Sequence, residues 1–281
     1  MNNLSTIIKN LEHEFIELIR QRFGLVVHIN QARGLVKTIT EACNKLNCSP
    51  AEYLQQLKNC SSSSSILADL IAAITVGESY FFRDKNQMQL LEKELLPRLL
   101  KQNKNNFTLK IWSAGCSTGE EIYTIAMLLS ELIPDINGWD LQLLGTDINV
   151  SALEKAKAGI YGQWSMRAIP DKYLQRYFSK EGRTYTLSPG IRNLVKFKYL
   201  NLSENSYPSI LSGINEVDLI LCRNVLIYFD NDCVIKIMKK LNASMTEGAY
   251  LLLGASDPIV TAETNFIFHH NGAIYFTKGN H

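Results

Sequence analysis

The chain has 281 residues, 29 of them basic and 27 acidic, and 46% of its residues are hydrophobic. This is the composition of an ordinary globular protein, and a net charge of +2 gives no argument for a nucleic acid or a membrane as partner. No apolar run approaches the roughly 20 residues that a membrane span needs, so no membrane insertion is expected. The first residues lack the pattern of a secretory signal, and the six cysteines form no zinc motif. We therefore expect a reduced, cytoplasmic protein without a metal site.

The N-terminal part is predicted to be an all-helical domain. Apolar residues recur at helical spacing between residues 4 and 19, and Ser49 to Glu52 (SPAE) has the serine, proline and glutamate of a helix start. Five consecutive serines, residues 61–65, indicate a flexible linker. The predicted division is a helical domain at 1–60, a linker and connecting helix at 61–75, and a main domain at 76–281.

From residue 66 onward, the pattern alternates between helix and strand. Helices are expected at 66–74 and at 88–100, with Pro97 kinking or ending the second one. The strands that follow are predicted at residues 109–112, 141–146, 195–200, 217–221 and 249–253. The helices between them are predicted at residues 120–133, 151–158 and 232–245. This alternation predicts a doubly wound, mostly parallel sheet.

The loop after the first predicted strand, Ser113–Gly119, is made of small residues that let the backbone approach a ligand. Its glycines do not form a dinucleotide fingerprint, and no lysine completes a phosphate loop. Glu120 and Glu121 follow directly, where a phosphate site favours backbone amides without negative charge. A loop that offers carboxylates suits a cationic ligand, which points to S-adenosylmethionine with its sulfonium and ammonium groups.

Four segments resemble, in the right order, the signatures of the CheR-type methyltransferases, which esterify receptor glutamates in bacterial chemotaxis. They are Val76–Asp84 (VGESYFFRD), Ser113–Ala126 (SAGCSTGEEIYTIA), Gly145–Ile148 (GTDI) and Cys222–Phe229 (CRNVLIYF). The likeness runs from about residue 66 to the C-terminus. It implies an α/β fold of the class I methyltransferase type, with a doubly wound, mostly parallel seven-stranded sheet. A small helical N-terminal domain and a short β-subdomain at about residues 178–200 complete the expected architecture.

The pairing of the last strand has two interpretations. Asn271-Gly272 separates two apolar segments, 266–270 and 273–277, and this pattern is typical of a local hairpin. The family instead places its last strand antiparallel beside the strand near Leu251, and this is the layout favoured here.

The candidate cofactor residues follow predicted strands, whose carboxyl ends meet at one edge of the sheet. Asp147 can accept hydrogen bonds from both ribose hydroxyls, or it merely caps the next helix. By resemblance, either Glu120 or Glu121 holds the methionine end of the cofactor, although both also fit capping boxes; Glu121 is preferred. The residues expected to bind S-adenosylmethionine, or its product S-adenosylhomocysteine, are Gly77, Ser79, Arg83, Ala114, Glu121, Asp147, Ile148, Asn201, Leu202, Asn224 and Val225.

Two residues are assigned to catalysis. A glutamate acceptor with a pKa of about 4.3 is already ionised at neutral pH, so it needs positioning and partial neutralisation rather than a strong base. Arg83 suits this task because arginine neutralises a carboxylate without donating its proton; the alternative is a surface ion pair with Asp84. Tyr228 closes the same pocket or belongs to the core. Asn201 can read the edges of adenine, or it is a turn residue.

The expected partner is an acidic methyl-acceptor protein, the cytoplasmic domain of a transmembrane chemoreceptor. The stretch 33–48 has few basic residues where the best-known members carry a strongly basic helix, which weakens the case for a receptor. The segment 178–190 is short, so we expect no docking of a C-terminal receptor peptide. Residues 167–198 have a local net charge of +6, eight basic and two acidic residues, which is either a solvated face or a surface that steers an acidic partner. Competing functions are methyl transfer to a small molecule or RNA, and a module that senses the cofactor without turnover. A monomer is expected.

Overall fold

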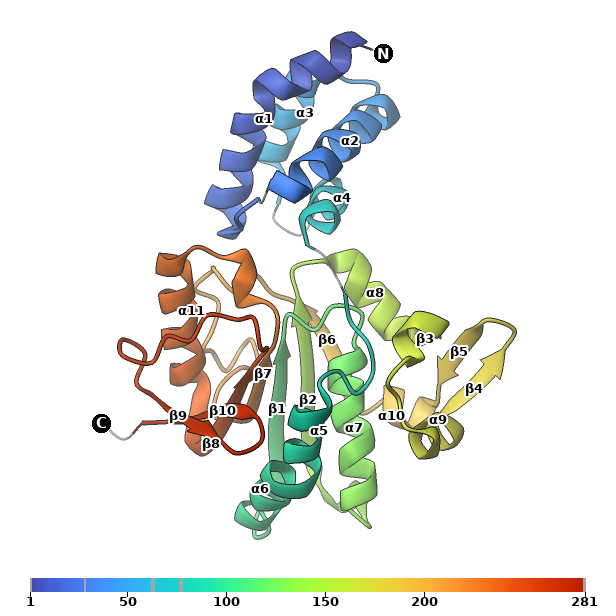
Figure 1. The fold of residues 1–281 in the computed structure, drawn as a ribbon, viewed down its shortest axis with the longest axis vertical. Helices are drawn as coiled ribbons and strands as arrows, with labels where there is room; N and C mark the ends of the chain where they lie inside the picture. The colour runs from blue at the N-terminus through green and yellow to red at the C-terminus, as the bar shows by residue number, and fades with distance from the viewer. Residues whose placement is uncertain (1, 28, 62–63, 76–77, 280–281) are drawn as a thin grey trace.

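The computed structural model describes residues 2–27, 29–61, 64–75 and 78–279, and a helical unit lies above a sheet domain (Figure 1). The helical unit contains α1 (Asn2–Phe23), α2 (Ile29–Leu46), α3 (Pro50–Asn59) and α4 (Ser65–Ile74). The predicted helix start at Ser49 is confirmed, because its hydroxyl accepts from the Glu52 amide while the Glu52 carboxylate accepts from the Ser49 amide. Among the described residues, no helix is both long and apolar enough to cross a bilayer.

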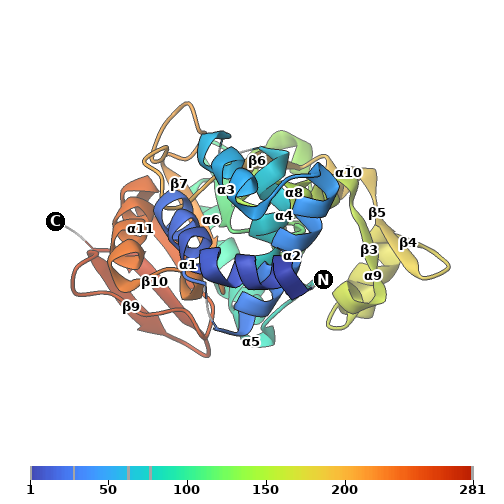
Figure 2. The same ribbon diagram turned by 90° about the horizontal axis from the view of Figure 1, so that it is seen from above.

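The helical unit has an apolar core of its own, built from buried side chains such as Phe15, Ile39 and Leu57. The helix α4, which the sequence assigns to a connecting segment, adds Leu67 and Leu70 to that core. Burying these side chains against α2 removes apolar surface from water, so α4 packs as a member of the helical unit. We therefore propose a helical domain that extends through α4. Figure 2, seen from above, shows α1 to α4 lying over the sheet domain.

The sheet domain is the predicted α/β fold, with seven strands in the order β6-β2-β1-β7-β8-β10-β9. The strands are β1 (Thr108–Ala114), β2 (Asp140–Asp147), β6 (Val195–Tyr199), β7 (Val217–Cys222), β8 (Met245–Leu253), β9 (Phe266–His270) and β10 (Ile274–Lys278). The first five in this order are parallel, and β10 is antiparallel to both of its neighbours. This is the strand order of class I methyltransferases, and the predicted fold class is confirmed.

Both interpretations of the last strand are correct at once. β9 and β10 form a hairpin in which Phe268 lies opposite Phe276. The other edge of β10 pairs with β8, where Phe276 lies opposite Leu251. A strand has two hydrogen-bonding edges, so the local hairpin and the family layout do not exclude each other.

Helices cover both faces of the sheet because successive side chains of each strand point to opposite sides. Ile111, Leu219 and Leu252 pack with α7 (Glu120–Leu132) and with the helical stretch 85–102, which consists of α5 (Lys85–Leu90), a π-helical turn and α6 (Leu96–Gln102). Their neighbours along the strands pack with α11 (Asn231–Ser244) on the other face. Pro97 does not end its helix: the π-helical turn Leu91–Leu95 comes just before it, and Pro97 stands in the first turn of α6.

A separate three-stranded antiparallel sheet projects to the side of the domain (Figure 1). It consists of β3 (Ile160–Gly162), β5 (Thr184–Leu187) and β4 (Phe178–Glu181) and is joined by the short helices α9 (Asp171–Tyr177) and α10 (Pro189–Arg192). It ends before the predicted limit of residue 200, because residues 195–199 belong to the large sheet as β6. It begins before residue 178, because β3 pairs with β5. The three residues of β3 are too few to produce a recognisable alternation in the sequence.

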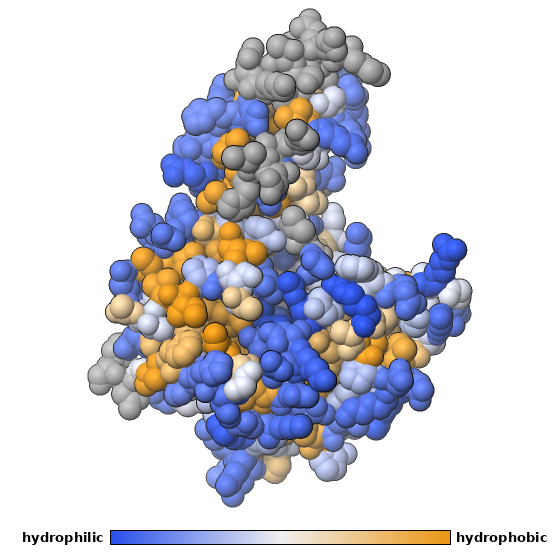
Figure 3. Space-filling model, in the orientation of Figure 1, coloured by the Kyte–Doolittle hydropathy of each residue, from blue (hydrophilic) through white to orange (hydrophobic). Residues whose placement is uncertain are grey.

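The surface differs between the two sides of the domain. In Figure 3, apolar residues gather on the side of α11 and the C-terminal strands, while hydrophilic residues predominate over α5 to α7. The edge strand β9 contributes Ile267 and Phe268, which are 49% and 45% exposed.

Candidate active site

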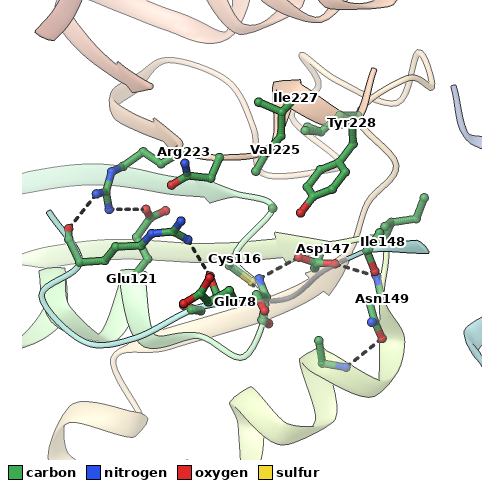
Figure 4. A pocket seen from close by; sticks show the side chains of 18 of the residues that line it. Glu78, Cys116, Glu121, Asp147, Ile148, Asn149, Arg223, Val225, Ile227 and Tyr228 are labelled. Atoms are coloured by element: carbon green, nitrogen blue, oxygen red, sulfur yellow. Dashed lines mark hydrogen bonds and ion pairs between the residues drawn. The ribbon is translucent and has the colours of Figure 1, made fainter. Parts of the chain in front are cut away.

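A cavity of about 300 Å³ lies at the carboxyl ends of β1, β2 and β7 (Figure 4). It forms where the strand order reverses, the usual ligand position in an open α/β sheet. Its lining includes ten predicted residues, namely Ser79, Arg83, Glu121, Asp147, Ile148, Asn201, Leu202, Asn224, Val225 and Tyr228. Gly77 lies outside the described residues. The topology therefore brings together segments that are far apart in the chain.

Ala114 is the predicted site residue that the structure places elsewhere. It is the last residue of β1, is completely buried, and packs in the apolar core on the α11 side of the sheet. The cavity is lined instead by the next residues, Gly115, Cys116 and Ser117. The reason is local: the strand ends at Ala114, so its methyl group still follows the alternation of the sheet.

Asp147 ends β2 and lies at the floor of the cavity (Figure 4). One carboxylate oxygen accepts from the Ser117 amide at 2.7 Å, and the other accepts from the Asn149 amide at 2.8 Å. The helix cap that the sequence allows for Asp147 belongs to Asn149, whose side chain accepts from the Ala152 amide at the start of α8 (Val150–Ala158). Burial raises the pKa of Asp147, while these backbone hydrogen bonds act in the opposite direction.

The two glutamates that start α7 lie in different environments. Glu120 is buried, and its carboxylate accepts from the hydroxyls of Thr118 and Ser165. Glu121 lines the cavity, and one of its oxygens accepts from the Ser113 hydroxyl at 2.7 Å. Successive residues of a helix point about 100° apart, so only one of the two can face the ligand.

Arg223 lines the cavity but is not among the site residues predicted from the sequence. Its Nη1 lies 3.0 Å from Oε2 of Glu121, and its Nη2 donates to the backbone carbonyl of Arg83 at 2.7 Å. Its Nε donates to Gln87, whose amide donates in turn to the carbonyl of Leu253. The network ties the cavity wall to α5 and to the end of β8. The sequence signal for Arg223 was its position in the Cys222–Phe229 motif, which also contains the predicted site residues Asn224 and Tyr228.

Asp257, in the loop after β8, shapes the segment that follows β7. One of its carboxylate oxygens accepts from the amides of Val225 and Leu226 at 3.0 and 2.9 Å, and the other accepts from the amides of Asn224 and Gly254. Its burial raises the pKa of the carboxyl, against the effect of these hydrogen bonds. A single carboxylate thus satisfies the turn that presents Asn224 and Val225 to the cavity. No motif around residue 257 indicated this role.

Gly115 lets two cavity loops come into contact. Its φ of +79° is disfavoured for other residues, and a Cβ built there would lie 2.5 Å from a methyl carbon of Val225. The loop after β1 therefore packs directly on the loop after β7, and the glycine in the motif has a packing reason.

The helical unit completes one wall of the cavity. Leu25 follows α1, lines the cavity, and forms an isolated antiparallel bridge with Phe229, while the Val26 amide donates to the Tyr228 carbonyl at 2.8 Å. Asn201 lies on the same side: its side-chain oxygen accepts from Ser203, and its amide group donates to the carbonyl of Arg22 at 3.2 Å. The turn interpretation of Asn201 is therefore present in the structure, and its amide also joins the two units.

Arg83 and Tyr228 face the cavity from separate elements. Nη1 of Arg83 donates to the backbone carbonyl of Glu78 at 2.6 Å. The Glu78 side chain is 53% exposed, so this part of the lining forms the mouth of the cavity. The Tyr228 hydroxyl points into the cavity (Figure 4). Burial raises the pKa of Tyr228, and the positive charge of Arg83 acts in the opposite direction, so the hydroxyl stays protonated at neutral pH.

The model of the CheR methyltransferase S-adenosylmethionine-binding domain matches residues 77–275. This chain belongs to the CheR methyltransferase family. A chemotaxis protein methyltransferase of Borreliella burgdorferi is 36% identical over 213 residues, covering 74% of this chain and 73% of that protein. Chemotaxis protein methyltransferase 1 of Pseudomonas aeruginosa is 36% identical over 195 residues, covering 68% and 69%. A chemotaxis protein methyltransferase of Listeria monocytogenes is 29% identical over 257 residues, covering 90% and 93%.

The membership confirms the predicted enzyme class, an S-adenosylmethionine-dependent methyltransferase of the chemotaxis type. The similarity to the Listeria protein covers most of both chains, so it extends beyond residues 77–275, which match the family model. Within the described ranges, no group of three or more histidine, cysteine, aspartate or glutamate side chains is placed to hold a metal ion.

Proposed function

We propose that this enzyme transfers the methyl group of S-adenosylmethionine to glutamate side chains of a chemoreceptor or a related signalling protein, forming glutamyl methyl esters. One observation carries the proposal: Arg83 lines the same cavity as Asp147 and Glu121. The cavity thus combines carboxylates, which suit a ligand with cationic groups and ribose hydroxyls, with a guanidinium, which suits a carboxylate acceptor.

The lining has the chemistry that the cofactor requires. Both oxygens of Asp147 hold one backbone amide each and keep lone pairs for the two ribose hydroxyls. Ile148, Leu202 and Leu25 supply apolar surface for the adenine. We assign the methionine end to Glu121 and the neighbouring Asn224 and Val225, and the contribution of Asn201 to its backbone, because its side chain is engaged by Ser203 and Arg22. When bound, S-adenosylmethionine supplies a methyl group activated by the sulfonium.

The protein's own task in the reaction is positioning. The acceptor glutamate is ionised without help, so Arg83 orients and partly neutralises it, which brings it close to the methyl group at little entropic cost. The Tyr228 hydroxyl, a donor at neutral pH, closes the pocket and excludes water. No general base is required in this scheme.

The basic stretch 167–198 supports acceptor docking less than its sequence suggests. Three of its cations form ion pairs with acids outside the stretch, Arg167 with Glu78, Lys172 with Glu92 and Arg176 with Glu131. These pairs offset half of the local net charge of +6. We therefore propose that the acceptor is recognised mainly at the mouth of the cavity, beside Arg83.

The working form that we propose is a cytoplasmic monomer that methylates its receptor without a C-terminal peptide tether. The names of the relatives support an acceptor in chemotaxis signalling. All six cysteines are free thiols in the structure, in keeping with a reducing compartment.

The test uses methyl-tritiated S-adenosylmethionine with membrane and soluble fractions of the source cell. Label that enters a membrane protein and is released by mild alkali as methanol establishes carboxyl methylation of a receptor. Alkali-stable label, or label in RNA or a small molecule, overturns the proposed acceptor. Cofactor binding without any label in protein, RNA or small molecules indicates a sensing module instead.

Arg83→Ala tests the residue that carries the proposal. The sequence also assigns Arg83 to the cofactor, but in this proposal its guanidinium serves the acceptor. We therefore expect turnover to fall to a trace while the dissociation constant of S-adenosylmethionine, measured by calorimetry, stays nearly unchanged. The matched control is Arg176→Ala. Like Arg83, Arg176 lies near a tyrosine ring and binds a glutamate residue, here through an ion pair with Glu131, but it lies outside the cavity lining. If cofactor affinity falls as much as turnover in Arg83→Ala, the acceptor role of Arg83 is wrong.

A further inference from the structure

The segment Glu78–Arg83, at the mouth of the cavity, is attached to a turn that belongs to the small-sheet region. The turn consists of the 3-10 helix Gln163–Met166 and Arg167, directly after β3. The Phe81 amide donates to the Ser165 carbonyl at 3.0 Å, and Oε1 of Glu78 lies 2.9 Å from Nη2 of Arg167. Glu78 and Arg167 are 89 residues apart in the chain, so only the tertiary fold brings the two segments together.

Arg167 is the centre of this attachment. Its guanidinium carbon lies 3.4 Å from the centre of the Tyr80 ring and 4.1 Å from that of the Trp164 ring. Its Nη1 donates to the Trp164 carbonyl at 2.8 Å, while Nη2 pairs with Glu78. A planar guanidinium that contacts two rings and is hydrogen-bonded at both terminal nitrogens has little freedom to rotate.

Glu78 and Tyr80, the residues that Arg167 contacts, also lie beside Arg83. The Glu78 carbonyl accepts from Nη1 of Arg83 at 2.6 Å, and the Tyr80 ring lies 5.8 Å from the Arg83 guanidinium carbon. Arg167 is therefore linked to Arg83 by two contact paths, one through Glu78 and one through Tyr80. Arg167 itself is not part of the cavity lining, whereas Glu78, Tyr80 and Arg83 are.

The same turn also contacts the cofactor side of the site. The Ser165 hydroxyl donates to the carboxylate of Glu120 at 2.9 Å, and the next residue along α7, Glu121, lines the cavity. The turn thus spans the space between the acceptor arginine and the helix that carries a cofactor residue.

We propose that Arg167 is a positioning residue for methyl transfer: the Tyr80–Arg167–Trp164 stack orients Arg83 toward the acceptor carboxylate. This inference rests on the acceptor role of Arg83 in the proposed function. A long arginine side chain loses rotamer freedom when it binds a carboxylate, and a prior restraint reduces that loss at the moment of binding. A misplacement of about 1 Å in a catalytic group is enough to slow a reaction by up to about 100-fold.

The kinetic test compares Arg167→Ala, Arg167→Lys and the control Arg176→Ala. Turnover is followed as alkali-released methanol, with membranes of the source cell as acceptor. We expect Arg167→Ala to lower kcat/KM for the acceptor by about 10- to 100-fold and to leave the dissociation constant of S-adenosylmethionine within about twofold. Lysine keeps the charge that pairs with Glu78 but not the planar stack, so Arg167→Lys should retain activity between that of Ala and wild type. Arg176→Ala should match wild type.

A double-mutant cycle separates positioning from general damage. If Arg167 acts only through Arg83, then Arg167→Ala has no further effect on the trace turnover that remains in an Arg83→Ala background, followed at high enzyme concentration. Additive losses contradict the inference. Glu78→Gln adds a second check, because it weakens the ion pair but keeps the backbone carbonyl that holds Arg83, and it should lower turnover less than Arg167→Ala does.

Hydrogen exchange provides a readout that needs no acceptor. The amides of Phe81 and Phe82 are bonded to the Ser165 carbonyl and the Thr124 hydroxyl. Their exchange should accelerate in Arg167→Ala and stay unchanged in Arg176→Ala. Unchanged exchange in both variants overturns the inference. If Arg83→Ala is as active as wild type, the proposed function of Arg83 fails; if Arg83→Ala is inactive but Arg167→Ala matches Arg176→Ala, only the present inference fails.

Discussion

Nη1 of Arg223 lies 3.0 Å from Oε2 of Glu121, and the two side chains are only 3% and 14% exposed. The other oxygen of Glu121 accepts from the Ser113 hydroxyl, so the protein itself engages both oxygens of this carboxylate. The carboxylate at the cofactor end of the cavity is therefore part of a fixed network rather than an isolated charge. Such a network orients the carboxylate oxygens of Glu121 before the cofactor binds.

Replacing Arg223 by alanine should destabilise the fold strongly, because Glu121 would keep a nearly buried charge without its partner. We expect the free energy of unfolding in urea to fall by about 3–5 kcal/mol. Lys157→Ala is the control, since its pair with Glu154 is 50% and 65% exposed and exposed pairs contribute less than about 1 kcal/mol. Equal losses in the two variants would contradict the importance of the buried pair.

Cofactor affinity should depend on pH through Asp147. Burial raises the pKa of this carboxyl, so the folded protein holds the proton more tightly than the unfolded chain. The stability that Asp147 contributes is therefore present at acid pH and lost as the pH rises through the folded pKa. The ionised form is the one that accepts from two ribose hydroxyls. An ordinary aspartate has a pKa of about 3.9, so it would become protonated and lose the cofactor only near that pH. Because the pKa of Asp147 is raised, the affinity for S-adenosylmethionine should begin to fall at a higher pH.

The measurement is the dissociation constant of S-adenosylmethionine, determined by calorimetry at a series of pH values from neutral down to about 4. Asp147→Asn should bind weakly, and its affinity should be flat over the same range because the titrating group is gone. A variant that binds weakly yet keeps the wild-type pH dependence would show that another group is responsible.

Gly115→Ala should distort the cofactor loop. The added Cβ would lie 2.5 Å from a Val225 methyl carbon at a backbone φ of +79°. We expect a loss of about 1–3 kcal/mol in thermal unfolding, together with weaker cofactor binding. Gly190→Ala is the control, because nothing lies within 4 Å of its added Cβ. Adding Val225→Ala to Gly115→Ala should restore part of the stability; no recovery would mean that the backbone conformation alone is decisive.

Leu25→Ala tests the contribution of the helical unit to the cofactor cavity. Leu25 is 4% exposed, and its removal should lower stability by about 2–5 kcal/mol. Because it also lines the cavity, the affinity for S-adenosylmethionine at a temperature where the variant is folded should fall as well. Leu46→Ala, at a position 41% exposed, should change neither quantity. Unaltered affinity in Leu25→Ala would show that the sheet domain alone holds the cofactor.

The sequence by itself determined the fold class and most of the candidate site. Apolar runs that end in short polar or small-residue segments located the strands and the loops after them, and the carboxyl ends of parallel strands necessarily share an edge. For this reason Asp147 and Asn224 could be placed in one cavity without coordinates, and the motif around Arg83 added the acceptor side.

Only the tertiary structure decided which side chains hold the site together. Arg223 and Glu121 are 102 residues apart, Gln87 and Arg223 are 136 apart, and Asp257 binds amides about 30 residues before it. The sequence around each of these residues does not reveal its partner, because the pattern of apolar residues that predicts its helix, strand or loop does not depend on that residue. The choice between Glu120 and Glu121 is of the same kind: adjacent helical residues share every local signal, and the packing of α7 against the sheet determines which one faces the cavity.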